Sequence, residues 1–241
     1  MKTITYAKRC FKEILRDPLT ISFGLGFPIV LLLLLSAMQA NIPVDLFKIE
    51  RLAPGIAVFG LSFISLFAAT LISKDKESLF LQRLYTTPLR SIDFILGYII
   101  PFVPLSLLQT TITYAIAIIL KLPVTINIVY AILLTLPISI LFISIGLFFG
   151  SLLNAKQVGG ICGALLTNLS AWLSGVWFDL ELVGDFFVFI AKLLPFVHCV
   201  ELQRGIISGN VNVVNLLVIL LYMIVITTLA VLVFLRQTRK K

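Results

Sequence analysis

Long apolar runs alternate with short polar segments along the chain, and six of these runs are about 20 residues long or longer. A helix of that length can cross the hydrocarbon core of a bilayer. The runs cover residues 19–40, 53–73, 94–120, 128–153, 158–178 and 213–235, and none of them contains Asp, Glu, Lys or Arg. The pattern predicts an all-α integral membrane fold, with six transmembrane helices in a single domain of residues 1–241.

The first eighteen residues are amphipathic when they are placed on a helical wheel. Apolar side chains fall within about 100° of arc on a helical wheel, and basic side chains occupy the adjacent face. The apolar set is Ile4, Ala7, Phe11, Ile14 and Leu15, and the basic set is Lys8, Arg9, Lys12 and Arg16. We therefore predict an amphipathic interfacial helix over residues 1–18, with its cations toward lipid headgroups, that ends where Pro18 follows Asp17. A membrane anchor and a contact with a partner are both open as its role.

A further apolar stretch, residues 182–200, lies between the fifth and sixth runs. It is interrupted by Gly184, Asp185, Lys192 and Pro195. Irregular backbone that faces lipid would leave its peptide groups without hydrogen bonds. We therefore predict that the outer loop, residues 179–212, holds a broken or re-entrant pair of short helices.

The basic residues are distributed unevenly between the two sides of this arrangement. If both termini share one side with the loop 74–93, fourteen of the 19 Lys and Arg residues lie on that side. The positive-inside rule then places both termini and this loop on the cytoplasmic side of a plasma or inner membrane. The formal net charge of +8 does not indicate nucleic acid, because only 12% of residues are charged and the basic ones lie at the ends of apolar runs.

The residue types that enzymes rely on are sparse. The chain has one His, and it lacks the GxxxxGK[ST] phosphate loop and any paired carboxylates or Ser-His-Asp set. Cys10, Cys162 and Cys199 are expected inside, within and outside the membrane, so none can form a disulfide with another. His198 and Cys199 lie near Glu201, but three candidates without a second cluster are a weak metal-site pattern. We expect neither an enzyme nor a metal site, and no cofactor held by this chain.

The absence of charge inside the six runs also bears on transport. Carriers driven by protons or sodium use an ionisable residue within the membrane to bind the driving ion. Energy for uphill transport would therefore enter through a cytoplasmic loop, and residues 74–93 form the internal loop that is large enough. In the fifth run, Gly159 and Gly163 form Gly-x-x-x-Gly, a pattern that lets helices approach closely. These glycines serve either helix packing within the chain or a dimer interface.

The loop before the third run carries an ordered set of motifs. Residues 82–84 read QRL, residues 87–89 read TPL and residues 95–97 read ILG. This segment resembles the signature loop of the type-2 ATP-binding-cassette (ABC) permeases, in particular the daunorubicin-exporter-like branch. A second segment, residues 194–205, resembles the outer segment that precedes the last span in that family. The chain departs from the family pattern at Gln82, where Glu is usual, and at Tyr98, where Lys is usual.

The resemblance implies the permease subunit of an exporter that uses ATP hydrolysed by a separate ATPase subunit. In that family a coupling helix between spans two and three docks on the ATPase. The residues that would do so here are Glu77, Leu79, Phe80, Arg83, Leu84, Thr87 and Pro88. The resemblance also implies two ATPase copies, a second permease copy or paralogue, and a hydrophobic or amphipathic substrate such as a drug, antibiotic or lipid-like molecule.

Two alternatives from other classes stay open. A secondary carrier or channel would transport without ATP, and the loop would then be dispensable. An integral membrane enzyme would turn over as a purified chain and would depend on His198 or a nearby carboxylate.

Overall fold

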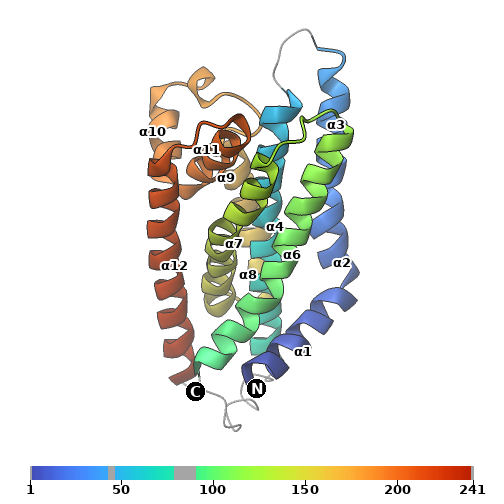
Figure 1. Cartoon of the computed structure of the whole chain (residues 1–241). Helices are drawn as coiled ribbons and strands as arrows, with labels where there is room; N and C mark the ends of the chain where they lie inside the picture. The colour runs from blue at the N-terminus through green and yellow to red at the C-terminus, as the bar shows by residue number, and fades with distance from the viewer. Residues whose placement is uncertain (1, 43–46, 79–90, 240–241) are drawn as a thin grey trace.

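The structure is a computed structural model that describes residues 2–42, 47–78 and 91–239. Within these ranges the chain is helical and contains no strand, which confirms the all-α prediction. The helices are α1 Lys2–Arg16, α2 Pro18–Ile21, η1 Ser22–Gly26, α3 Phe27–Gln39, α4 Ile49–Glu77, α6 Ser91–Ile119, α7 Asn127–Leu152, α8 Ala155–Val158, η2 Gly159–Leu166, α9 Thr167–Trp172, η3 Leu180–Leu182, α10 Asp185–Leu193, α11 Pro195–Ser208 and α12 Val213–Arg239. The long helices run side by side, and the two termini lie at the same end of the bundle (Figure 1).

Five helical segments in the described part of the chain are long and apolar enough to cross a membrane. They are Pro18–Gln39, Ile49–Glu77, Asp93–Ile119, Asn127–Leu152 and Val213–Gln237. These segments coincide with the first four predicted spans and the last one. The chain is therefore a multi-pass membrane protein. Its bundle has one end that carries both termini and an opposite end that carries neither (Figure 1).

The fifth predicted span is not among these five segments. Its place is taken by the consecutive elements α8, η2 and α9, of which η2 is a π-helix. This segment begins beside the end of α4, where the N–H of Ala155 donates to the carboxylate of Glu77 at 2.8 Å. After α9, Gly175 is linked through Arg204 to Arg51 at the start of α4. The segment therefore follows α4 from one end of the bundle to the other.

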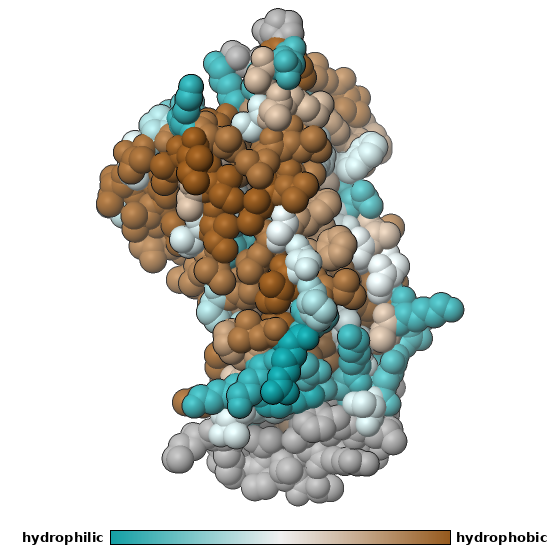
Figure 2. Space-filling view, turned by 90° about the vertical axis from the view of Figure 1, so that its right-hand side faces the viewer, coloured by the Kyte–Doolittle hydropathy of each residue, from teal (hydrophilic) through white to brown (hydrophobic). Residues whose placement is uncertain are grey.

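α4 lies at the centre of the bundle. In the most apolar stretch of this helix 83% of the residues are buried, compared with 22% in that of the first candidate span and 11% in that of α12. Most of the exposed side chains of these outer helices are apolar, and Figure 2 shows a broad apolar surface with polar residues gathered in a band near the end that carries the termini. Lipid is the solvent that such a surface requires, because water would leave it unfavourably hydrated.

The outer segment is broken where the sequence predicts a break. α9 ends at Trp172 rather than Phe178, because Gly175 turns the chain with a φ of 70°. Gly184 has a φ of 112° and separates η3 from α10, and Pro195 begins α11. Both glycines occupy a backbone region that is unfavourable for residues with a side chain. The predicted pair of short helices is confirmed, and these helices lie at the end of the bundle opposite the termini (Figure 1).

Close packing of α4 against α7 depends on two glycines that the sequence analysis did not single out. A Cβ atom on Gly146 would overlap the carbonyl oxygen of Ser65, and one on Gly150 would lie 2.6 Å from the carbonyl oxygen of Ala69. The two glycines are four residues apart, so they form a Gly-x-x-x-Gly face on α7. This face permits contact between the backbones of the two helices.

We predict that Gly146→Ala destabilises the protein by about 1–3 kcal/mol, because the added methyl group forces α7 away from α4. Gly26→Ala is the matched control, since a Cβ atom at that helical position has no atom within 4 Å. Unfolding in detergent measures both changes. Equal stability of the two variants would show that the close approach of α4 and α7 is not required.

Candidate functional site

A buried carboxylate, Asp75, lies in the last turn of α4 directly before the loop 79–90. Arg9 donates to both of its oxygens, at 2.6 and 2.7 Å. Tyr98 of α6 donates to it at 2.8 Å, and Tyr6 of α1 at 3.5 Å. A carboxylate at a helix C-terminus is opposed by the helix dipole, and burial adds to that penalty unless the charge is paired. The four hydrogen bonds compensate Asp75, and they join α1, α4 and α6 at one point.

α1 also contacts the helix that follows the loop. The hydroxyl of Thr3 donates to the carboxylate of Asp93 in the first turn of α6. The ring of Tyr6 lies against Gly97 so closely that any Cβ atom there would overlap it. Tyr6 also makes an edge-to-face contact with Phe94, with ring centroids 5.6 Å apart. α1 therefore binds the chain on both sides of residues 79–90.

This docking divides the apolar face of α1 in two. One stripe, which includes Tyr6, Cys10 and Ile14, is buried against the bundle. The other, which includes Ile4 and Leu15, stays exposed, and Lys8, Lys12 and Arg16 are exposed as well. The prediction of a helix that ends before Pro18 is confirmed. The prediction that Arg9 faces lipid headgroups is wrong, because its guanidinium is drawn to the buried charge of Asp75.

The charges in this network are held in fixed states. Burial acts to lower the pKa of Arg9, but the hydrogen bonds and the charge of Asp75 outweigh it and raise that pKa further. Burial raises the pKa of the Cys10 thiol to about 12, although the nearby Arg9 opposes this shift. Burial also raises the pKa of Glu13, which pairs with Arg9 at 2.8 Å. Near neutral pH the ion pair is therefore intact, and Cys10 is a protonated thiol with little reactivity.

The two residues that follow Asp75 connect the same corner to the other half of the bundle. The ammonium group of Lys76 donates to three carbonyl oxygens at the C-terminus of α7, with the shortest distance, 2.6 Å, to Leu153. Glu77 accepts the N–H of Ala155 at the N-terminus of α8. Each charge is placed at the helix end whose dipole attracts it. The entrance of the loop 79–90 is thus bonded to α1, α6, α7 and α8.

Of the predicted coupling residues, Glu77 is described and is exposed at the end of α4. Leu79, Phe80, Arg83, Leu84, Thr87 and Pro88 lie outside the described residues, so their predicted roles stay predictions. The sequence did not predict that Arg9, Asp75 and Tyr98 form one buried network. A signal was present in Asp75, an acidic residue at the unfavourable end of a helix, but its partner lies 66 residues away in the chain.

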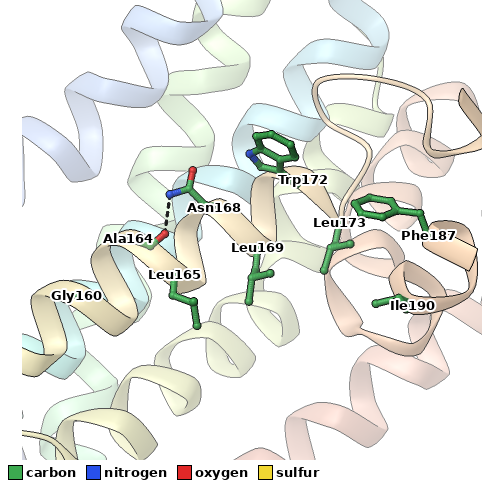
Figure 3. A pocket seen from close by; sticks show the side chains of 9 residues that line it. All are labelled: Gly160, Ala164, Leu165, Asn168, Leu169, Trp172, Leu173, Phe187 and Ile190. Carbon is green, nitrogen blue, oxygen red and sulfur yellow. Dashed lines mark hydrogen bonds between the residues drawn. The ribbon is translucent and has the colours of Figure 1, made fainter. Parts of the chain in front are cut away.

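An apolar groove of about 690 Å³ follows the outward face of η2 and α9. Leu165, Leu169 and Trp172 line it with exposed fractions of 59%, 40% and 56%. Figure 3 shows Leu165, Leu169 and Leu173 at successive turns on one side of the helix, and Phe187 of α10 at the far end. The amide of Asn168 donates to the carbonyl oxygen of Ala164, so this polar lining residue is already hydrogen-bonded within its own helix (Figure 3).

The predicted Gly-x-x-x-Gly motif lies at the start of this groove. Among the described residues, a Cβ atom on Gly159 or Gly160 would have no atom within 4 Å, and one on Gly163 would make ordinary contact with Leu66 at 3.5 Å. Close packing within the single chain therefore does not use Gly159, whereas it does use Gly146 and Gly150 of α7.

Comparison with protein families gives a match to the ABC-2 type transporter membrane domain over residues 1–208. The chain belongs to this family. The match includes the buried network around Asp75, the groove and the outer segment, and it ends before α12. A comparison with curated proteins gave no significant match. The protein is accordingly a permease component of an ABC-type transporter. Members of this family work with an ABC ATPase, and the permease is not itself an enzyme.

We predict that Arg9→Ala lowers the free energy of unfolding of this permease by about 2 kcal/mol, because it leaves the Asp75 carboxylate buried without a counter-ion. Removing one partner from a fully buried pair costs about 3–5 kcal/mol, and Arg9 is 34% exposed. In a background with Cys162 and Cys199 replaced by Ala, the maleimide labelling rate of Cys10 should rise as α1 separates from the bundle.

The matched control is Arg16→Ala, which removes an exposed cation from the same helix. It should leave both the stability and the Cys10 labelling rate unchanged. If the two variants behave alike, the ion pair does not hold α1 in place.

Proposed function

We propose that this chain is the membrane-spanning subunit of an ABC exporter, and that a separate ATPase subunit binds and hydrolyses the ATP. The observation that carries the proposal is the set of bonds at the entrance of the loop 79–90. Asp75, Lys76 and Glu77 are bonded to four other helices, so a displacement of this loop would move α1, α6, α7 and α8 together. A loop that only joined two spans would not require these bonds.

In this proposal the loop acts as the coupling element. Leu79, Phe80 and Leu84 would offer an apolar surface to a groove on the ATPase, and Glu77, Arg83 and Arg90 would pair with charges around it. Thr87-Pro88 would end the coupling helix. The abundance of Lys and Arg near the termini supports placing this end of the bundle on the cytoplasmic side of the cell membrane. The segment α8–η2–α9 would then be the sixth membrane crossing.

We further propose two permease copies, identical or paired with a paralogue, and two ATPase subunits. The groove on η2 and α9 supports a second copy as its occupant, because it begins at glycines that a single chain leaves without close neighbours. A helix could approach Gly159 and Gly160 closely there. The walls of the groove are aliphatic and aromatic, which suits a hydrophobic or amphipathic cargo such as a drug, antibiotic or lipid-like molecule between the two copies.

We predict that Arg83→Glu combined with Leu84→Asp abolishes both association with the ATPase and ATP-dependent export, because it reverses a charge and removes an apolar contact in the coupling element. Affinity purification from the native host in mild detergent measures association, and transport into inverted vesicles measures export. The control is Lys121→Glu with Val124→Asp, which makes the same kinds of change in the loop at the opposite end of the bundle.

Membrane insertion should be unaffected in both variants. Normal export by the Arg83/Leu84 variant would refute the coupling role. If the wild-type chain is folded and monodisperse but purifies without an ATPase, a carrier or channel that is not coupled to ATP becomes the better interpretation.

We predict that Leu165→Cys, in a chain whose three native cysteines are replaced by Ala, forms a disulfide-linked dimer on mild oxidation in membranes. The control is Leu217→Cys on α12, since the two leucines have exposed fractions of 59% and 60%. A second copy seated on the groove would cross-link the first variant and not the second. Equal cross-linking of both variants, or of neither, would contradict this placement.

A further inference from the structure

A second cavity, of about 310 Å³, lies at the end of the bundle opposite the termini. Its walls come from the start of α4, the turn after α9, and the helices α10 and α11. Six charged residues line it, three of each sign: Arg51, Lys192 and Arg204, and Asp179, Glu181 and Glu201. The groove on η2 and α9 has apolar walls, so the two sites would accept chemically different occupants.

Direct contact neutralises one pair of opposite charges in this cavity and leaves four charges apart. Arg51 forms an ion pair with Asp179. Across the part of the chain that the structure describes, no carboxylate lies within 4 Å of Lys192 or Arg204, and no cation lies within that distance of Glu181 or Glu201. Two cations and two anions thus face one cavity and remain apart. Glu181, Lys192 and Glu201 are exposed, so the space between these charges is open to a polar ligand from outside.

Arg204 is the most constrained of these groups. Its Nε donates to the carbonyl oxygen of Arg51 at 3.0 Å, and its Nη2 donates to that of Gly175 at 2.9 Å. Burial and the neighbouring charge of Arg51 lower the pKa of Arg204 to about 10, although Asp179 and Glu201 oppose this shift. The backbone contacts hold the guanidinium in place, and its Nη1, which has no hydrogen bond to the residues that the structure describes, can donate to an anionic oxygen.

The surroundings of the cavity place it at the boundary of the membrane. α10 and the turn before it expose large apolar side chains next to the charged lining. Leu182, Val183, Phe186 and Phe189 have exposed fractions of 75%, 51%, 78% and 67%. An amphipathic helix with such a face lies among lipid headgroups, with its apolar side toward the acyl chains.

We propose that this cavity binds the phosphoethanolamine headgroup of a lipid in the adjacent leaflet. The phosphate would lie against Arg204 and Lys192, and the ammonium group would donate to Glu181 and Glu201. The acyl chains would then extend along the exposed apolar face of α10. This site is independent of the exported substrate and of ATP, so it stands or falls separately from the proposed transport function.

The mixed charge of the lining determines the class of ligand. A purely anionic headgroup, as in phosphatidylglycerol, would place its phosphate near two carboxylates without supplying a cation for them. A choline headgroup carries both charges, but its trimethylammonium has no N–H and cannot donate to Glu181 or Glu201, whereas an ammonium group has three donors.

Native mass spectrometry of the protein released from detergent tests the proposal without any ATPase. The wild-type chain should retain phosphatidylethanolamine about tenfold better than phosphatidylcholine or phosphatidylglycerol with the same acyl chains. Glu201→Gln and Lys192→Gln should each reduce this preference several-fold. Glu50→Gln and Lys121→Gln, which change exposed charges that do not line the cavity, should preserve it. Arg204 is left intact because its side chain also holds two backbone carbonyl groups.

Competition with soluble glycerophosphoethanolamine identifies the source of the headgroup. The lipid assignment requires that this compound, at the same concentration as the phosphatidylethanolamine, displaces little of the bound lipid. Displacement at equal concentration would instead assign the cavity to a soluble zwitterion. Equal retention of the three lipids, or loss of preference in the control variants as well, would overturn the proposal.

Discussion

The pairing of Arg9 with Asp75 is the constraint on which the end of the bundle with the termini depends. Asp75 is 4% exposed and sits where the dipole of α4 disfavours a negative charge. A charged donor from another helix neutralises it at that place, and two tyrosine hydroxyls add hydrogen bonds. Arg9 does so from α1, and α1 in turn closes over Gly97 of α6. The amphipathic helix α1 is thereby part of the bundle.

The bundle combines a tightly packed centre with open outer faces. α4 and α7 approach each other through Gly146 and Gly150, so relative motion between them would require their backbones to separate. Along the segment from α8 to α9, Gly159 and Gly160 have open space beside them, and the wider turns of the π-helix η2 lie in the same stretch. π-helical turns are frequent at functional sites. In the function we propose, the firm centre would transmit displacement and the open face would receive a second copy.

The two ends of the molecule use charge differently. At the end with the termini, Arg9 and Asp75 are neutralised by direct contact, and the result is mechanical attachment. At the other end, Arg204 is fixed by backbone carbonyl groups and Arg51 pairs with Asp179, while Lys192, Glu181 and Glu201 face the cavity apart from one another. Direct ion pairs hold elements together, whereas separated charges in a cavity leave capacity for a ligand.

The sequence by itself determined the fold class, the family resemblance and most helix positions. Backbone groups in lipid must be satisfied within each segment, so apolar runs of about 20 residues are helical whatever their neighbours are. Gly184 and Pro195 likewise break the outer segment for local reasons. The sequence also identified the loop 74–93, although of its predicted coupling residues only Glu77 lies among those the structure describes.

Only the tertiary structure decided which faces of these helices meet. Hydropathy fixes where a membrane helix begins and ends, but it says little about its rotation, because lipid and neighbouring helices are both apolar surroundings. Arg9 could therefore be assigned to headgroups, and Gly159 could be noticed while Gly146 was not. The Asp75 network and the cavity at Arg204 join residues that are far apart in the chain. Their contacts follow from the docking of separate helices, which no local pattern records.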